Sequence, residues 1–181
     1  MFRVRNLMVI CALLSATSSV AQEGQYEYYN FLEDHPPISI IVPPSPISGI
    51  AAGDLVRDAQ FCKKEDRFIC VLNESFSFAV PRSPRKLAGT WKYNGEEYRI
   101  IRRGSVNALG LHEKVVFIES VQKFMTYIFV YSPCKGLLGF SATGNSSTQL
   151  YVLVQMDGFG AKNECPAPDT NLNKGGRATS P

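Results

Sequence analysis

The sequence predicts an exported, all-β and mostly antiparallel domain, folded as a small barrel or sandwich of about eight strands and cross-linked by disulfides. Three observations support this fold class. The 181 residues are 45% apolar and 11% aromatic, which is typical of one globular domain. Short runs rich in valine, isoleucine and aromatics alternate with turn residues. Four cysteines follow an N-terminal segment that has the features of a secretory signal.

Residues 1–21 contain the three parts of a signal peptide. Arg3 and Arg5 form a positive start, an apolar core follows at 7–14, and small residues at 19–21 form a cleavage site. The core is about half as long as a membrane-spanning helix. We therefore expect cleavage after residue 21 and a periplasmic or secreted protein with no membrane span in the mature chain.

Residues 22–58 differ in composition from the rest of the chain. They carry six acidic residues against one basic residue, a net charge of −5, whereas the chain from residue 59 onward carries +6. Five prolines lie between positions 36 and 46, and proline fixes φ and removes a hydrogen-bond donor. This pattern predicts a flexible, acidic, Pro-rich segment, and packing of this segment on the basic body is the alternative. The β domain is then expected at 59–166 and a disordered tail at 167–181.

The predicted strands of the β domain are runs rich in β-branched and aromatic residues, bounded by Gly, Asn and Ser. They are Phe68–Leu72, Phe76–Val80, Leu87–Tyr93, Glu96–Arg102, Val115–Gln122, Met125–Ser132, Leu137–Thr143 and Gln149–Met156. Residues 113–131 also fit helical spacing, so strand and helix both remain open there. Runs such as 125–131 are apolar on both faces, so we expect a helix, a loop or a partner on the second face.

An Asn-Gly pair at positions 94–95 predicts a tight hairpin with a type I′ turn. This turn fixes the register of the two flanking strands. It places Lys92 opposite Glu97 as an ion pair, and Trp91 opposite Tyr98 as an aromatic pair on the other face. A slip of one residue would lose both pairs, so the register is self-consistent.

The cysteines predict two disulfides. Cleavage of the signal removes Cys11 and leaves Cys62, Cys70, Cys134 and Cys165, an even number in an oxidising compartment. Four cysteines allow three pairings, and the spacing favours Cys62 with Cys70 and Cys134 with Cys165. A zinc site usually shows C-x2-C pairs, which are absent from this sequence, so we expect no metal.

The sequence contains no recognisable catalytic set. His112-Glu113 starts like the H-E-x-x-H zinc motif, but Val116 stands where the second histidine belongs. Ser141 has a G-x-S-x-x-G spacing, which is not that of a nucleophile elbow. With His35 as the only other histidine and no glycine-rich phosphate loop, we expect neither an enzyme nor a cofactor. A secreted hydrolase with an unrecognised site at His112 is kept as an alternative.

The hairpin strand after residue 95 is basic and carries the candidate partner-binding residues. These are Arg99, Arg102 and Arg103, together with Trp91 and Tyr98. The register puts Arg99 on the opposite face from Trp91, and Arg103 shares the face of Arg99 if the strand extends that far. Arginine suits an acidic partner, although a solvated strand face is the alternative. We expect a binding, inhibitor or immunity-type function with a protein partner and no nucleic acid.

Residues 87–91 read Leu-Ala-Gly-Thr-Trp, which resembles the G-x-W opening strand of lipocalin-like barrels. The resemblance covers five residues, and the tight turn at 94–95 departs from the long loop that follows this strand in the family. It implies, as an alternative function, a carrier of a small apolar ligand, with no ligand residues carried over.

Overall fold

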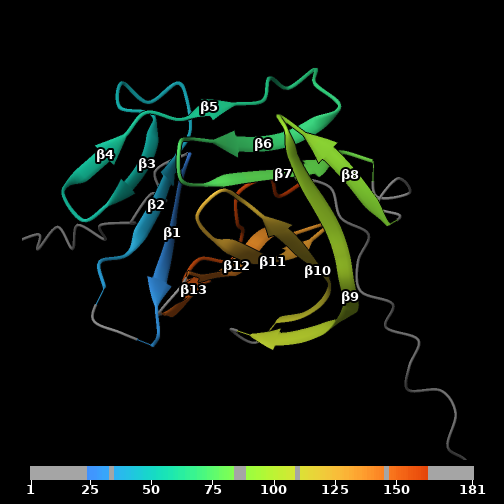
Figure 1. The fold of residues 1–181 in the computed structure, drawn as a ribbon. Helices are drawn as coiled ribbons and strands as arrows, with labels where there is room; N and C mark the ends of the chain where they lie inside the picture. The colour runs from blue at the N-terminus through green and yellow to red at the C-terminus, as the bar shows by residue number, and fades with distance from the viewer. Residues whose placement is uncertain (1–23, 33–34, 84–88, 109–110, 145–146, 163–181) are drawn as a thin grey trace, which may run out of the picture.

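The computed structural model describes residues 24–32, 35–83, 89–108, 111–144 and 147–162. In these residues all regular structure is β-strand, and every paired strand is antiparallel (Figure 1). The predicted all-β class is therefore confirmed. None of the described segments forms a helix with the length and hydropathy to cross a bilayer. The predicted signal at 1–21 and the tail at 167–181 lie outside the described residues.

The described strands form two sheets. The larger sheet consists of β1 (Gln25–Asn30), β2 (Ile38–Ile41), β3 (Gly49–Ala52), β4 (Leu55–Arg57), β8 (Thr90–Tyr93), β9 (Glu96–Ala108), β10 (Leu111–Val121), β11 (Thr126–Ser132), β12 (Gly136–Thr143) and β13 (Thr148–Leu153). Its order is β4-β3-β2-β1-β13-β12-β11-β10-β9-β8, with no closure into a barrel among the described strands. The smaller sheet has the order β5 (Gln60–Phe61), β6 (Phe68–Leu72), β7 (Ser77–Pro81). The described residues contain thirteen strands, of which nine, β5–β13, lie after residue 59, where about eight were predicted.

The larger sheet is curved, and the smaller sheet lies across the space that it encloses. Figure 1 shows β1–β4 and β8–β9 rising on the two sides, with β5–β7 spanning the top. The core lies between the sheets and is rich in aromatic rings. Phe78 of β7 lies 5.0 Å from Phe129 of β11, and Phe76 lies 5.1 Å from Phe140 of β12. These contacts between ring centroids join the two sheets.

The prediction of a flexible segment at 22–58 is wrong, because residues 25–57 contain β1–β4. β1 pairs with β13, and β2, β3 and β4 extend the sheet from β1. Tyr28 and Ile40 are fully buried in the core. The prolines stand in the connections on either side of β2, where no ladder donor is needed: Pro36, Pro37, Pro43, Pro44 and Pro46. The prolines separate short strands and do not prevent strand formation. Because β1–β4 belong to the larger sheet, the domain begins well before residue 59.

The predicted hairpin at 94–95 is confirmed in every pair. Trp91 lies opposite Tyr98 and Lys92 opposite Glu97, and the Lys92 ammonium is 3.6 Å from the Glu97 carboxylate. Asn94 and Gly95 have φ angles of 49° and 84°, the positive values that a type I′ turn requires.

Residues 113–131 form strands and no helix, which settles the open alternative. β10 and β11 pair antiparallel across a turn in which the Gln122 N–H donates to the Met125 carbonyl at 2.9 Å. Along β11 the side chains of Tyr127, Phe129 and Tyr131 are buried in the core. The residues between them point to the other face, so the period of two dominates over the helical spacing.

Side chains cover the free edge of β7. The Gln122 side-chain amide accepts from the Ser77 N–H at 3.0 Å and donates to the Ser77 carbonyl at 2.6 Å, as a neighbouring strand would. The Trp91 indole N–H donates to the Ala79 carbonyl, two residues further along β7, at 3.0 Å. An uncovered edge strand invites pairing with another chain. The larger sheet thus satisfies polar groups of this edge without adding a strand.

Candidate functional site

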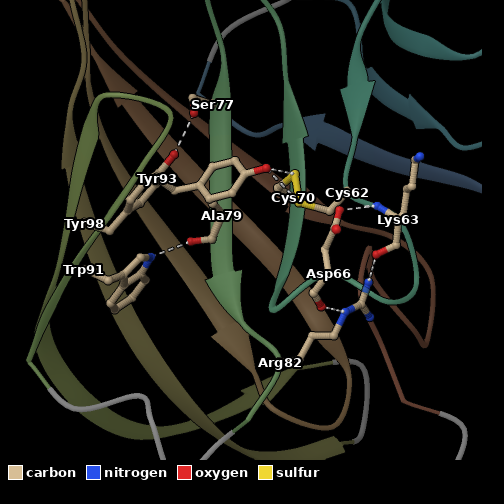
Figure 2. Close-up of a disulfide and its surroundings, with 10 residues drawn as sticks. All are labelled: Cys62, Lys63, Asp66, Cys70, Ser77, Ala79, Arg82, Trp91, Tyr93 and Tyr98. Carbon is tan, nitrogen blue, oxygen red and sulfur yellow. Dashed lines mark hydrogen bonds between the residues drawn. A yellow bond between two sulfur atoms is a disulfide. The ribbon is translucent and has the colours of Figure 1, made fainter.

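Two of the predicted partner-binding residues, Trp91 and Tyr98, hold the β8–β9 hairpin on the smaller sheet (Figure 2). Their rings stack with centroids 5.7 Å apart. Tyr98 is fully buried, and its hydroxyl shares a hydrogen bond of 2.6 Å with the Ser77 hydroxyl. The Trp91 ring is half-buried and donates to Ala79. The Tyr98 side chain therefore has no surface for a partner, and its role is structural.

A β-bulge in β9 changes the faces on which the arginines lie. Ile100 lies opposite Ile118, and Arg102 lies opposite Phe117, so Ile101 is an extra residue in β9. An extra residue reverses the alternation of side chains along the bulged strand. The sequence carries a sign of this bulge, because the alternation breaks where two apolar residues, Ile100 and Ile101, are followed by two basic residues, Arg102 and Arg103.

Arg99 and Arg102 consequently share a face, and Arg103 lies on the other one. The Arg99 guanidinium pairs with the Glu119 carboxylate at 2.5 Å, and Arg102 Cζ lies 4.0 Å from the Phe117 ring centroid. Glu119 and Phe117 are two residues apart in β10, so both pairs are on one face. The expectation that Arg103 shares the face of Arg99 is wrong. Of the predicted set, the structure brings together only Arg99 and Arg102 on one surface.

That surface continues as a band of apolar side chains across β9–β13, which we name the open face. Its apolar members are Ile101, Phe117, Ile128, Val130, Leu138, Leu150 and Val152, and Arg102 lies beside Phe117 at one end. Two shallow depressions of about 460 and 200 Å³ lie on it and share Val130 and Leu150. In the part of the chain that the structure describes, these side chains line open depressions and are not covered by another layer.

Charged groups stand at two ends of the open face. Arg102 lines the larger depression and packs on Phe117. Glu113 lines the smaller one and accepts a hydrogen bond from the Ser132 hydroxyl at 3.1 Å. The expectation that β11 is apolar on both faces indicated this surface. It missed Phe117 and Leu150, which reach the surface only through the pairing of β10–β13.

A second concave surface lies beside the predicted Cys62–Cys70 disulfide, which is confirmed. The Cα atoms of the two cysteines are 5.0 Å apart, and the Tyr93 hydroxyl lies 3.1 Å from Cys62 Sγ and 3.3 Å from Cys70 Sγ (Figure 2). The adjoining groove has a volume of about 530 Å³. We name it the cationic groove, lined by Val42, Pro43, Phe61, Cys62, Lys63, Lys64, Ile69, Cys70, Arg82, Phe159, Gly160, Ala161 and Lys162.

We expect replacement of Cys62 and Cys70 by alanine to lower the free energy of unfolding by about 2 kcal/mol. The short loop that the disulfide closes gives a small entropic contribution, and Tyr93 loses its contact with both sulfurs. Urea unfolding of the double variant measures the loss. Reducing agent is not an equivalent test, because Cys134 also takes part in a disulfide. An unchanged unfolding midpoint would contradict a stabilising role for this disulfide.

The predicted Cys134–Cys165 pair stays a prediction, because Cys165 lies outside the described residues. The Cys134 N–H donates to the Ser132 hydroxyl oxygen at 3.1 Å. This bond fixes the turn between β11 and β12.

The residues considered for catalysis do not come together. His112 is exposed, and its Nδ1 lies 2.5 Å from the Asn107 side-chain oxygen. Ser141 lies within β12, opposite Ile128 and Leu150, and not at a strand-to-helix turn. Among the described residues, no three His, Cys, Asp or Glu side chains are grouped to hold a metal ion.

Comparisons of the chain with models of known families, with curated proteins and with solved structures find no match. Function has therefore to be inferred from the open face and the cationic groove.

Proposed function

We propose that this protein is exported and acts by binding another protein through the open face, as a binding, inhibitor or immunity-type protein. The observation that carries the proposal is the apolar band across β9–β13, which no described residue covers. A sheet usually packs each apolar face against another layer. Contiguous apolar patches that remain exposed in a monomer mark interaction sites.

The composition of the open face favours a protein partner. Phe117, Ile128 and Val130 are half-buried within the sheet, so they form a surface that is already ordered before binding. Arg102 and Glu113 add one charge of each sign near the two ends of the apolar band. Opposite charges on a partner would set its orientation, since charged groups at the edge of an interface mainly provide specificity.

The Cys62–Cys70 disulfide supports export. Disulfides persist in oxidising compartments and are rare in the cytosol. This agrees with the signal-like sequence at 1–21 and with a periplasmic or secreted location.

We describe the scaffold as a sandwich of two sheets, because Phe78 of β7 packs on β11 and Phe76, just before β7, packs on β12 through aromatic rings. A lipocalin-like carrier would hold its ligand inside the fold. In the described residues the rings of Phe76, Phe78, Phe129 and Phe140 occupy that space, with centroid separations from 5.0 to 6.2 Å. The carrier alternative therefore has less support than a binding surface on the outside of the larger sheet.

The test is capture of the partner from the envelope or medium of the source cells by immobilised mature protein. We expect Ile128→Lys and Leu150→Lys each to reduce capture at least 10-fold, because a lysine at the centre of an apolar interface leaves a charge without a partner. The matched control is Val56→Lys, since Val56 is 41% exposed on β4, at the far edge of the sheet.

Two results would overturn the proposal. One is capture that is equal for all three lysine variants, with thermal melts showing that each is folded. The other is concentration-dependent dimerisation in sedimentation experiments that Ile128→Lys abolishes, because a second copy of the chain would then cover the open face.

A further inference from the structure

We propose that the cationic groove binds a small amphiphilic anion, a molecule with one carboxylate, sulfonate or phosphate group on an apolar body. The groove lies on the smaller sheet and shares no lining residue with the open face. The inference therefore does not depend on the proposed function.

Three separate segments build the groove around the smaller sheet. Val42 and Pro43 come from the β2–β3 connection, residues 61–64 come from β5 and its loop, and residues 159–162 follow β13. The volume of about 530 Å³ is that of a site for a small molecule, since such sites span about 300–1,000 Å³. A groove of this size accommodates one ring system or a short acyl chain with its head group.

The floor of the groove is apolar and tightly packed. Ile69 and Phe159 are buried, and the Phe61 and Phe159 ring centroids are 6.1 Å apart. Gly160 has a φ of 81°, and a Cβ at this position would lie 2.7 Å from Ile69 Cγ2. The backbone at Gly160 thus rests directly on Ile69, which makes the floor ready to receive an apolar body without rearrangement.

Four cations, and no acidic residue, are among the described residues that line the groove. They are Lys63, Lys64, Arg82 and Lys162. Charges of one sign around a concave surface raise the local concentration of an oppositely charged ligand. No lysine of this set forms an ion pair with the described residues, so their charge is available to an anion.

Arg82 is positioned by carbonyl groups rather than by a carboxylate. Its Nε donates to the Asp66 carbonyl at 2.8 Å and one Nη donates to the Lys63 carbonyl at 2.9 Å (Figure 2). The Asp66 carboxylate instead accepts the Lys63 N–H at 2.7 Å. These bonds, with the disulfide, fix the loop that carries Lys63 and Lys64. The positive end of the groove is therefore ordered before any ligand arrives.

The apolar floor and the cationic rim together determine the ligand class. A neutral apolar molecule would make no use of the four cations, and an inorganic anion would leave the floor exposed to water. A molecule with both parts satisfies both surfaces, since apolar burial supplies affinity and the charged group fixes orientation.

The test uses the dye 1-anilinonaphthalene-8-sulfonate as the probe, titrated by fluorescence against the mature protein. N-phenyl-1-naphthylamine has the same ring system without the sulfonate and serves as the neutral comparison. We expect the sulfonate dye to bind at least 10-fold more tightly than the neutral one. Its affinity is expected to fall as salt is added, because ions screen charges at an open surface.

The decisive variant is Lys63→Glu with Lys64→Glu, which we expect to weaken binding of the sulfonate dye at least 10-fold. The matched control is Lys114→Glu with Lys123→Glu, which changes the net charge equally at exposed lysines of the larger sheet and its β10–β11 turn. Ala161→Trp fills the groove without changing charge and is also expected to abolish binding. It provides the test if the loop variant does not fold.

Equal affinity of the dye for the loop variant and its control would overturn the proposal, as would equal affinity of the two dyes. An acidic peptide that displaces the sulfonate dye as well as a small anion does would overturn the small-molecule assignment. Ile128→Lys separates this site from the open face. If dye binding is lost in Ile128→Lys and kept in Ala161→Trp, the dye reports the open face and the cationic groove is not an anion site.

Discussion

Replacing Phe78 by alanine is expected to lower the free energy of unfolding by about 3–5 kcal/mol, the cost of removing a fully buried aromatic ring. Phe78 is the second residue of β7 and is 0% exposed. Its ring contacts Phe129 and Tyr131 of β11 and Phe159 after β13, with centroids 5.0, 6.0 and 6.2 Å away. The cavity would therefore open where the two sheets and the C-terminal segment meet, and these neighbours belong to two separate elements, β11 and the segment after β13, which cannot close together over it.

Urea unfolding followed by the fluorescence of the single tryptophan, Trp91, measures this loss. Phe124→Ala is the control, because Phe124 is 66% exposed and the same substitution there is expected to change stability by less than about 0.5 kcal/mol. Total stabilities of domains are about 5–15 kcal/mol, so Phe78→Ala can leave much of the protein unfolded. Phe78→Leu then provides a smaller, measurable step. A loss below about 1 kcal/mol for Phe78→Ala would show that the two sheets do not depend on this contact.

The features that sequence reasoning predicted correctly are local. The β8–β9 hairpin is determined by the Asn94-Gly95 turn and by pairs a few residues apart, so its register follows from the chain itself. The Cys62–Cys70 disulfide spans eight positions, and its loop is polar and short. Neither feature requires knowledge of what lies on the other side of the sheet.

The features that sequence reasoning missed depend on distant pairing. β1 pairs with β13, more than one hundred residues away in the chain, and this pairing turns an acidic, Pro-rich segment into one side of the domain. The bulge at Ile101 coincides with a break in alternation at Ile100-Ile101, but which residue is extra depends on how β9 fits against β10. Register in a sheet is determined by the partner strand as much as by the strand itself.

The candidate sites show the same division. Alternation correctly placed Trp91 and Tyr98 on one face of the hairpin, but it does not tell which face meets the smaller sheet. An aromatic ring suits a partner surface and a core equally well. The cationic groove was not predicted, because its lining comes from three segments that meet only in the folded chain.

The protein is expected to unfold cooperatively at about pH 11 because of its buried tyrosines. Burial raises the pKa of Tyr127 and Tyr131 to about 12, and Arg82 partly offsets the rise at Tyr131. Burial also raises the pKa of Tyr28 and Tyr98, and in both cases a hydrogen bond opposes the rise. An unfolded tyrosine ionises near pH 10.

The direction of the pH dependence follows from the difference between the pKa of each tyrosine in the folded and in the unfolded protein. The folded state keeps these phenols neutral above the pH at which the unfolded chain ionises, so their contribution to stability is complete below about pH 10 and is lost as the pH rises toward 12. Each group removes about 1.4 kcal/mol per pH unit in this window, so the four together remove about 5.5 kcal/mol per pH unit. Raising the pH by one unit above 10 therefore removes a free energy that approaches the whole stability of a small domain.

Urea unfolding at intervals between pH 9 and 11.5, with tyrosinate absorbance at 295 nm, measures the slope of stability against pH. Tyr127→Phe is the informative variant. It loses the hydrogen bond from the Tyr127 hydroxyl to the Ser75 carbonyl, at a cost of about 1 kcal/mol at neutral pH. It also removes one titrating group, so its slope is expected to fall by about a quarter. A wild-type slope at or below about 1.4 kcal/mol per pH unit would mean that at most one of these tyrosines stays neutral in the folded protein through this range, and the explanation of alkaline unfolding by buried phenols would then be wrong.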